Sequence, residues 1–281
     1  MELLDHKLKV APTSALVLLQ TRSLYDSGIA GQYYDLLDFG DVRELSSGIQ
    51  GAWPHFSTVV LYRKRFIRHL LETYLQDGKP VQVCILGAGL DPISLWLLEH
   101  HRQAISRIYE VDAVHMPVKS SLYARLLPGE PALHFIQADI TDTLHLLDKL
   151  RDAGYSTEEP ALVIFEGVIH YIPDELFLNT MQTFRTPNKT NVVIMDYLLP
   201  EHKVPVADRP VLRDLLARME NFIGGRMYQY ERREIFRLVE LLHGDVASVG
   251  SLQDIEFKLN GRNELFYEDG EGFMEMIAFY L

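Results

Sequence analysis

Two glycines and an aspartate follow a short apolar run and could form a nucleotide-binding turn. The run starts the segment Val81-Gln-Val-Cys-Ile-Leu-Gly-Ala-Gly-Leu-Asp-Pro92 and is typical of a strand buried on both faces. Gly87 and Gly89, with Ala88 between them, can form a tight turn that lets the backbone approach a ligand closely. Asp91 would then cap the next helix, with a proline as its first residue. A strand, a glycine turn and a helix form the first half of a nucleotide-binding βαβ unit.

The start of this helix bears on which cofactor can bind. Dinucleotide-binding turns carry a third small residue and leave the helix N-terminus free for a pyrophosphate. Here Pro92 stands at that third position, and the carboxylate of Asp91 would repel a phosphate. The turn therefore favours an adenosine cofactor without phosphate, such as S-adenosylmethionine, over a nicotinamide dinucleotide. Because a Gly-x-Gly turn also occurs at ordinary strand-to-helix connections, the acidic residues downstream must decide between the two interpretations.

Two acidic residues end the next predicted strand. The segment 106–112 is short, contains Ile108, Tyr109 and Val111, and carries Glu110 and Asp112 at its end. These residues lie about twenty positions beyond the glycines, where a βαβ unit places a carboxylate on ribose hydroxyls. We therefore predict that Glu110 and Asp112 bind the cofactor.

Carboxylates also follow later strands. Asp139 ends a predicted strand at 133–138, where it can accept a hydrogen bond from an adenine amino group while Ile140 packs on the ring. Strands are also predicted directly before Glu166 and Asp196. Because the carboxyl ends of parallel strands meet at the edge where open α/β sheets bind ligands, this repeated placement predicts one binding site.

The chain resembles the leucine carboxyl methyltransferase family of S-adenosylmethionine-dependent enzymes, which includes protein phosphatase methyltransferases and many bacterial small-molecule O-methyltransferases. The matching segments are Ile85-Leu-Gly-Ala-Gly-Leu-Asp91, Tyr109-Glu-Val-Asp112 with Lys119 following, Ala138-Asp-Ile140, and Phe165-Glu-Gly-Val-Ile-His-Tyr171. The resemblance covers about residues 55 to 200 and is poor at both ends. It implies S-adenosylmethionine as cofactor and an α/β fold with a doubly wound, mostly parallel, seven-stranded Rossmann-like sheet.

The resemblance also extends to a basic segment, Tyr62-Arg-Lys-Arg-Phe-Ile67. It aligns Arg63 with the arginine that meets the cofactor carboxylate in the family. Lys64 and Arg68 stand where the family usually has threonine and aspartate, so Arg65 remains an alternative partner for the carboxylate.

The expected reaction is an in-line displacement at the sulfonium methyl group, for which the protein must hold the acceptor and exclude water. A carboxylate acceptor is ionised at neutral pH and needs no general base. A phenol or alcohol would need one, and His170 is the nearest candidate, although a packed wall residue is the alternative role. We expect Tyr171 to shape the pocket. The interpretation is O-methylation of a small-molecule carboxylate or hydroxyl; S- or N-methylation of a small metabolite and a non-catalytic protein that binds S-adenosylmethionine remain as alternatives.

Composition argues against other classes. The chain has 281 residues, 47% of them hydrophobic, and no apolar run long enough to cross a bilayer. The formal net charge of −12, without a basic patch interleaved with aromatic residues, argues against a nucleic-acid partner. The eleven histidines show no metal-binding pattern, and the single cysteine, Cys84, is expected in the core. The cytoplasm is the default location, and the oligomeric state stays open.

These residues must be positioned by one domain, residues 1–281. We expect residues 1–55 to form an N-terminal cover and residues 200–245 a lid inserted before the last strands. Within the cover, the sequence predicts a helix near 12–24 and a loop over 28–53. The remaining predicted elements are helices at 61–76, 209–222 and 231–242 and a final strand at 274–281, paired in a hairpin with residues near 255–266.

Overall fold

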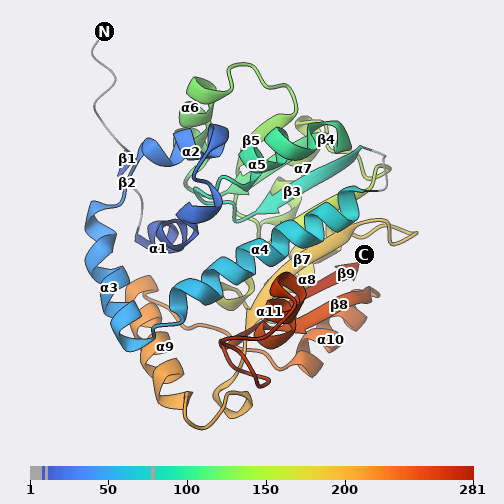
Figure 1. Cartoon of the computed structure of the whole chain (residues 1–281). Helices are drawn as coiled ribbons and strands as arrows, with labels where there is room; N and C mark the ends of the chain where they lie inside the picture. Colours follow the sequence, from blue (N-terminus) through green and yellow to red (C-terminus); the bar gives the residue numbers. More distant parts are fainter. Residues whose placement is uncertain (1–7, 10–11, 77–79) are drawn as a thin grey trace.

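A seven-stranded sheet forms the centre of the computed structural model, which describes residues 8–9, 12–76 and 80–281 (Figure 1). The strand order is β5-β4-β3-β6-β7-β9-β8. The strands β3 to β7 pair in parallel, and β9 runs antiparallel to both β7 and β8. Their bounds are β3 Val81–Leu86, β4 Ile105–Asp112, β5 Leu133–Gln137, β6 Ala161–Phe165, β7 Val192–Leu198, β8 Asp245–Ser251 and β9 Met274–Tyr280. The predicted fold class is therefore confirmed.

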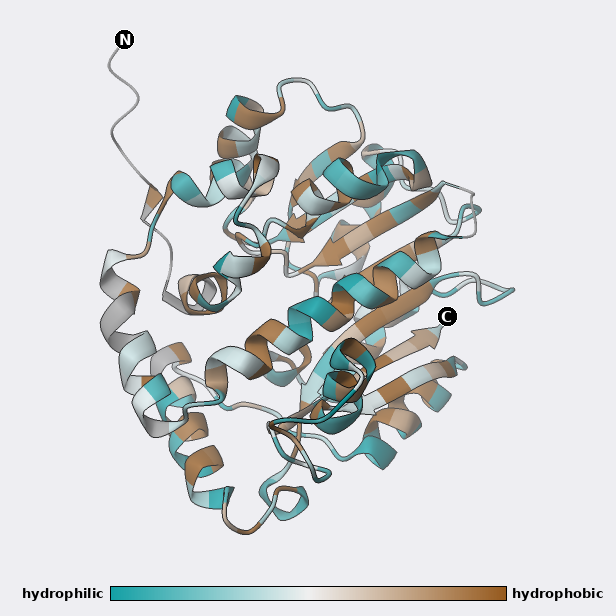
Figure 2. Ribbon diagram, viewed as in Figure 1, coloured by the Kyte–Doolittle hydropathy of each residue, from teal (hydrophilic) through white to brown (hydrophobic). Residues whose placement is uncertain are grey.

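The chain reverses its direction of travel across the sheet at β3, since β4 and β5 lie on one side of this strand and β6 and β7 on the other. Such a reversal opens a crevice at the carboxyl ends of the strands, where α/β proteins bind ligands. Every residue of β6 is buried, as are all residues of β3 after the first. Figure 2 shows most of the central strands in the hydrophobic colour, as expected for strands covered on both faces.

Helices pack on both faces of this sheet. They are α4 (Phe56–Leu75), α5 (Ile93–His101), α6 (Met116–Leu126), α7 (Thr143–Asp152), α8 (Asp174–Gln182), α10 (Arg232–Leu241) and α11 (Leu252–Asn260). The long helix α4 crosses the front of the molecule in Figure 1. It forms because apolar residues recur at helical spacing, with Phe66, Ile67, Leu70 and Leu71 all buried on one side. None of the helices in the described residues is long and apolar enough to cross a membrane.

The N-terminal region contains more helix than the sequence predicts. Helix α1 (Pro12–Thr21) and the 3-10 turn Arg22–Leu24 confirm the first predicted helix. The predicted loop over 28–53 is wrong, because most of it forms α2 (Gly28–Asp35) and α3 (Arg43–Ala52), with the two-residue strands β1 (Leu8–Lys9) and β2 (Leu37–Asp38) paired beside them. Glycine-rich sequence has low helix propensity, but α2 buries two tyrosines completely and packs against α5 and α6.

The C-terminal part differs from expectation in one pairing. Helix α9 (Arg209–Ile223) forms as predicted, ends at Gly224 with φ +68°, and packs against α3. The predicted hairpin partner of β9 near 255–266 is wrong, because β8 pairs with β9 instead. The chain turns into α11 directly after β8. The side chains of Ser251 and Asp254 exchange capping hydrogen bonds at the start of α11, a helix signal that outweighs the apolar residues behind it.

Candidate functional site

A cavity of about 330 Å³ lies at the carboxyl ends of β3, β4 and β6. The turn Gly87–Asp91 forms one wall, and Asp112 stands at the end of β4. Arg63 and Lys64 enter from α4, and Glu166–Val168 follow β6. The ends of β3, β4 and β6 thus converge on one cavity, whereas Asp139 after β5 and Asp196 of β7 do not line it.

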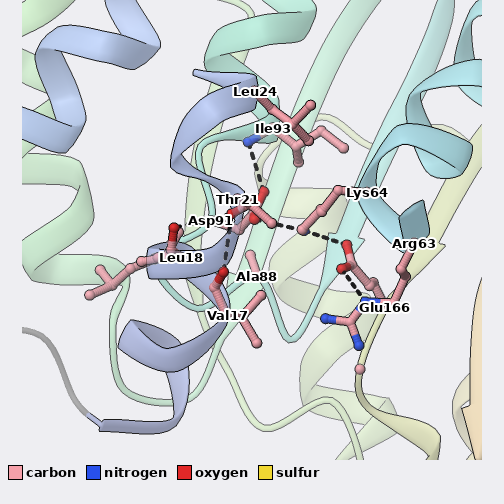
Figure 3. Close-up of polar contacts among 12 residues, drawn as sticks. Val17, Leu18, Thr21, Leu24, Arg63, Lys64, Ala88, Asp91, Ile93 and Glu166 are labelled. Atoms are coloured by element: carbon pink, nitrogen blue, oxygen red, sulfur yellow. Dashed lines mark hydrogen bonds and ion pairs between the residues drawn. The ribbon is translucent and has the colours of Figure 1, made fainter. Parts of the chain in front are cut away.

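Two further elements close the cavity. Val17 and Leu18 of α1 line it with apolar side chains, and both are labelled in Figure 3. Tyr171 lines it from the connection between β6 and α8. The sequence analysis did not include Val17 and Leu18 in the site, because a helix far along the chain shows its packing partner only in three dimensions.

The glycine turn leaves no room for a side chain at its first position. Gly87 has φ +66° and Gly89 has φ +48°, a region that other residues rarely adopt. A Cβ atom added to Gly87 would lie 2.7 Å from Cγ2 of Val168. The turn therefore requires glycine at this position for steric as well as conformational reasons.

The helix beyond the turn begins one residue later than predicted, so Asp91 precedes the N-cap instead of forming it. Helix α5 begins at Ile93, with Pro92 as its N-cap, and Oδ1 of Asp91 accepts a hydrogen bond from the backbone N–H of Ile93 at 3.0 Å. The carboxylate of Asp91 therefore occupies the helix N-terminus, although its negative charge is offset by Lys64. The prediction that a phosphate is excluded therefore rests on this occupation rather than on simple repulsion.

A chain of alternating charges forms the floor of the cavity. Nζ of Lys64 lies 2.6 Å from Oδ2 of Asp91 and 2.5 Å from Oε2 of Glu166. Nε of Arg63 lies 2.8 Å from Oε1 of Glu166, and Nη1 of Arg63 lies 3.3 Å from Oδ2 of Asp196. Figure 3 shows Lys64 between Asp91 and Glu166, with Arg63 beside Glu166. The turn, β6 and β7 are thus connected through two consecutive residues of α4.

The charges of this chain stabilise one another. Burial alone would lower the pKa of Lys64, but the carboxylates of Asp91 and Glu166 outweigh it and raise this pKa above its ordinary value. Burial opposes the ionisation of Asp91, yet Lys64 holds the pKa of this carboxyl below its ordinary value. Both groups are therefore ionised at neutral pH. Lys64 is a residue of the site that sequence analysis missed; a lysine in the middle of a buried helical face is the signal that could have revealed it.

Asp112 presents an ionised carboxylate at the edge of the cavity. Its Oδ2 accepts a hydrogen bond from the backbone N–H of Gly89 at 3.1 Å. Its Oδ1 accepts from the backbone N–H groups of Val114 and His115 at 2.9 and 2.8 Å. Burial raises the pKa of Asp112, but the hydrogen bonds from the ring and backbone of His115 outweigh this effect and the pKa falls below its ordinary value. Asp112 is thus joined to the glycine turn and remains an acceptor.

Glu110 lies beneath the cavity and not in its wall. Its side chain is fully buried, forms an ion pair with Lys119 and accepts a hydrogen bond from Ser94. The prediction that Glu110 contacts the cofactor is therefore corrected. The reason is its position two residues inside β4, under the helices α5 and α6, whereas Asp112 stands where the strand ends.

Asp139 and Ile140 follow β5 and do not line the cavity. Asp139 is exposed, and its Oδ1 accepts hydrogen bonds from the backbone and side chain of Thr141 at 2.8 and 2.7 Å. The side chain of Ile140 is 9% exposed. A contact of these two residues with adenine stays a prediction.

His170 lies behind Tyr171. Its side chain does not line the cavity, is 5% exposed, and has an Nδ1 atom without a hydrogen-bond partner in the described part of the chain. Burial lowers its pKa to about 4, with Asp196 opposing and Arg63 adding to this shift. The ring centroids of His170 and Tyr171 are 4.8 Å apart. His170 is therefore neutral at pH 7 and lies outside the lining of the cavity, next to Tyr171.

The two other arginines of the basic segment point elsewhere. Arg65 donates a hydrogen bond to Oδ1 of Asn260 at 3.2 Å. The guanidinium carbon of Arg68 lies 4.2 Å from the ring centroid of Tyr25 and 4.7 Å from that of Trp96. Arg65, the alternative partner for a cofactor carboxylate, is therefore away from the cavity that Arg63 lines.

Comparison with known proteins agrees with this geometry. The sequence profile described as leucine carboxyl methyltransferase matches residues 29–185, more than half of the chain. The chain belongs to the leucine carboxyl methyltransferase family. Membership in this family makes it a methyltransferase with S-adenosylmethionine as cofactor. No curated protein sequence matches the chain.

Solved structures resemble the methyltransferase along nearly its whole length. A candidate methyltransferase of Thermobifida fusca YX has a TM-score of 0.68 and 16% identity, over 96% of this chain and 94% of that chain. A DUF574 family protein of Streptomyces avermitilis MA-4680 has a TM-score of 0.64 and 14% identity, over 96% and 97% of the two chains. At these identities the two structures establish the shared fold. The magnesium protoporphyrin IX methyltransferase ChlM of Synechocystis PCC 6803, solved with bound S-adenosylhomocysteine, has a TM-score of 0.49 and 13% identity, over 95% and 99% of the two chains.

The residues of the cavity fit the chemical groups of S-adenosylmethionine. Gly87 and Gly89 line the cavity without a side chain, so a ligand can approach the backbone there. Ionised Asp112 can accept hydrogen bonds from hydroxyl groups. Arg63, Lys64 and Glu166 supply both signs of charge for a group that carries an ammonium and a carboxylate.

Proposed function

We propose that this methyltransferase binds S-adenosylmethionine in the cavity at β3, β4 and β6 and methylates an oxygen atom of a small molecule, with a carboxylate as the favoured acceptor. The observation that supports this proposal is the position of ionised Asp112 beside the glycine turn, in one cavity with Arg63, Lys64 and Glu166. Asp112 provides an acceptor for hydroxyl groups, and the other three residues provide both signs of charge.

Each residue has a distinct role in the proposal. Asp112 would accept hydrogen bonds from the ribose hydroxyls, and Gly87 and Gly89 would allow close approach of the backbone. Arg63 would meet the methionyl carboxylate, for which a guanidinium offers two parallel donors. Glu166 would accept a hydrogen bond from the methionyl ammonium group of the cofactor.

When bound, the cofactor supplies a methyl group on positively charged sulfur, an electrophile that needs no acid activation. The protein then has to orient the acceptor and keep water out. Tyr171, Val17 and Leu18 line the cavity and would exclude water from it. We also propose that residues 1–55 and 200–245 together cover the acceptor side, because α3 of the first segment packs against α9 of the second.

The state of His170 favours a carboxylate over a hydroxyl acceptor. A general base is most effective when its pKa lies near the operating pH. Burial lowers the pKa of His170 to about 4, and His170 does not line the cavity, so it is a poor base for a phenol or an alcohol. A carboxylate acceptor is already ionised and needs no base. S- or N-methylation and a non-catalytic role remain the alternatives that the experiment must separate.

The test combines binding and turnover. Calorimetry with S-adenosylmethionine, S-adenosylhomocysteine and NAD should give binding for the first two ligands alone. Labelled S-adenosylmethionine should then transfer its methyl group to members of a pool of small carboxylic acids, and not to pooled phenols, amines or thioethers. Transfer only to amines or thioethers would contradict O-methylation, and binding without transfer to any pool would favour the non-catalytic alternative.

A pH profile distinguishes the two oxygen acceptors. With a carboxylic acid, the rate should be level between about pH 6 and 9, because neither the acceptor nor a base changes its charge there. The variant His170→Gln should keep this rate. A rate that rises with pH and falls in His170→Gln would instead identify a hydroxyl acceptor with His170 as its base.

A further inference from the structure

A group of buried polar side chains lies beneath the glycine turn. Ser94 comes from α5, Glu110 from β4 and Lys119 from α6, and all three side chains are fully buried. Lys119 forms an ion pair with Glu110, which also accepts a hydrogen bond from Ser94. None of these side chains lines the cavity. The group can therefore act on a ligand only through the backbone of the turn above it.

Lys119 contacts that backbone directly. Its Nζ atom donates a hydrogen bond to the carbonyl oxygen of Asp91 at 2.6 Å and lies 3.5 Å from the carbonyl oxygen of Ala88. A third carbonyl of the turn, that of Leu90, accepts a hydrogen bond from Oη of Tyr33 at 3.0 Å. The underside of the turn is thus held by side-chain donors, mainly by the ammonium of one lysine.

The turn needs such support because its backbone is intrinsically mobile. Gly87 and Gly89 both have positive φ, and glycine has access to many other conformations. A cofactor that contacts the backbone closely requires one of these conformations. A buried ion pair is by itself weak evidence for stability, since well-packed apolar residues often serve as well. Apolar residues would, however, leave the carbonyl of Asp91 without the donor it has here.

We propose that Lys119 is a positioning residue, which holds the turn Ala88–Asp91 in the conformation that binds the cofactor, and that Glu110 keeps the ammonium of Lys119 directed at this turn. The inference rests on the proposed binding of S-adenosylmethionine at the turn. It assigns to Glu110 a role in cofactor binding without contact with the cofactor.

Three variants separate positioning from stability. Glu110→Gln leaves Lys119 without its partner but keeps the donor to the turn. Lys119→Met removes the donor and leaves a buried carboxylate unpaired. The double variant Glu110→Gln/Lys119→Met also lacks the donor, but it contains no unpaired charge. The measurements are the melting temperature of the ligand-free protein and the dissociation constant of S-adenosylhomocysteine.

The expected results differ between the two measurements. The melting temperature should fall in both single variants and recover by at least half in the double variant. The dissociation constant should rise about threefold in Glu110→Gln, because Lys119 loses the partner that directs it at the turn. It should rise about tenfold or more in both variants that lack Lys119, a loss of about 1.4 kcal/mol. Arg232 and Glu275 form an ion pair away from the cavity, at 2.8 Å, and serve as a matched control. The double variant Arg232→Met/Glu275→Gln should leave the dissociation constant unchanged.

Hydrogen exchange gives a second readout that needs no cofactor. In the ligand-free double variant at Glu110 and Lys119, the backbone amides of residues 88–91 should exchange at least tenfold faster than in wild type, while those of β3 should not change. A double variant that recovers in melting temperature and also binds S-adenosylhomocysteine as tightly as wild type would make the pair purely structural. If wild type itself does not bind S-adenosylhomocysteine, the proposed function fails; unchanged exchange in the turn would then overturn the positioning role as well.

Discussion

The variant Lys64→Met should destabilise the ligand-free protein strongly at neutral pH. The side chain of Lys64 is 4% exposed, and its ammonium contacts both Asp91 and Glu166. Methionine keeps the length and the packing of the side chain but removes the charge. Glu166 retains its contact with Arg63 in the variant, so Asp91 is the carboxylate that loses its partner.

The magnitude follows from the burial of this pair. Removal of one partner from a buried ion pair costs about 3–5 kcal/mol, because it leaves an uncompensated charge. The side chain of Asp91 is 16% exposed and still accepts the hydrogen bond from Ile93, so some of the charge is solvated. We therefore expect the free energy of unfolding to fall by about 3 kcal/mol, the lower end of this range.

The dependence on pH has a definite sign. In wild type the pKa of Asp91 is below its ordinary value of 3.8, so its stabilising contribution is present above pH 4 and is lost as the pH falls through the folded-state pKa. The pKa of Lys64 is above its ordinary value of 10.5, so its contribution is lost only as the pH rises through the raised value. Without Lys64, burial raises the pKa of Asp91. The stability of the variant should therefore increase as the pH falls from 7 to 5, whereas wild type should not gain.

Urea unfolding at pH 5, 6, 7 and 8 measures both effects. The control is the double variant Lys64→Met/Asp91→Asn, which has no stranded carboxylate and should recover at least half of the loss at pH 7. A loss below about 1 kcal/mol at pH 7, with the same pH dependence as wild type, would match a solvent-screened surface pair and refute the reasoning.

Three more variants test the cavity. Gly87→Ala should lose about 1–2 kcal/mol of stability, because alanine disfavours the positive φ of this position. It should also lose at least tenfold in cofactor affinity, because the new Cβ would lie 2.7 Å from Val168. Unchanged cofactor binding in calorimetry would show that the turn adapts. Arg63→Lys should raise the dissociation constant of S-adenosylmethionine at least tenfold, about 1.4 kcal/mol, since lysine cannot form a bidentate pair with a carboxylate. Arg65→Lys is the matched control. A loss of affinity in Arg65→Lys alone would show that Arg65, and not Arg63, meets the cofactor carboxylate. Asp112→Ala should weaken cofactor binding by about 1–3 kcal/mol. Because the pKa of Asp112 is lowered, the cofactor affinity of wild type should stay level from pH 8 to 5. A wild-type affinity that falls at pH 5 would contradict an ionised Asp112.

Continuous apolar runs predicted the strands of the sheet well. The segments at 81–86 and 161–165 form β3 and β6 with these bounds. Such runs are reliable because a strand covered on both faces is apolar at most positions. In β3 the exception is Gln82, which is buried and donates hydrogen bonds to the carbonyl oxygens of Ser156 and Glu159. The glycines and Asp112 were predicted for a similar reason, since their role depends on the ends of adjacent elements and little on distant residues.

Local sequence failed where distant packing decides the conformation. Residues 28–53 have the composition of a loop, but α2 forms there because Tyr33 packs against Tyr123 of α6, and Tyr34 packs against Tyr25 and shares a hydrogen bond with Thr21. The pairing of β8 with β9 in place of the predicted hairpin depends in the same way on which segment reaches the edge of the sheet. Propensity is a weak prior that tertiary contacts override.

The sequence by itself determined the strand–turn–helix unit at 81–93, the alternation of strands and helices that follows it as far as β7, and the position of Asp112 at a strand end. The tertiary structure alone decided the roles of Lys64 and Glu110. Lys64 meets Glu166 across 102 positions of the chain, and Glu110 is turned inward to Lys119 rather than to the cavity. The physical reason is that the energy of a charge depends on its burial and on the distance to its partners, and both are set by the packing of helices on the sheet and not by spacing along the chain.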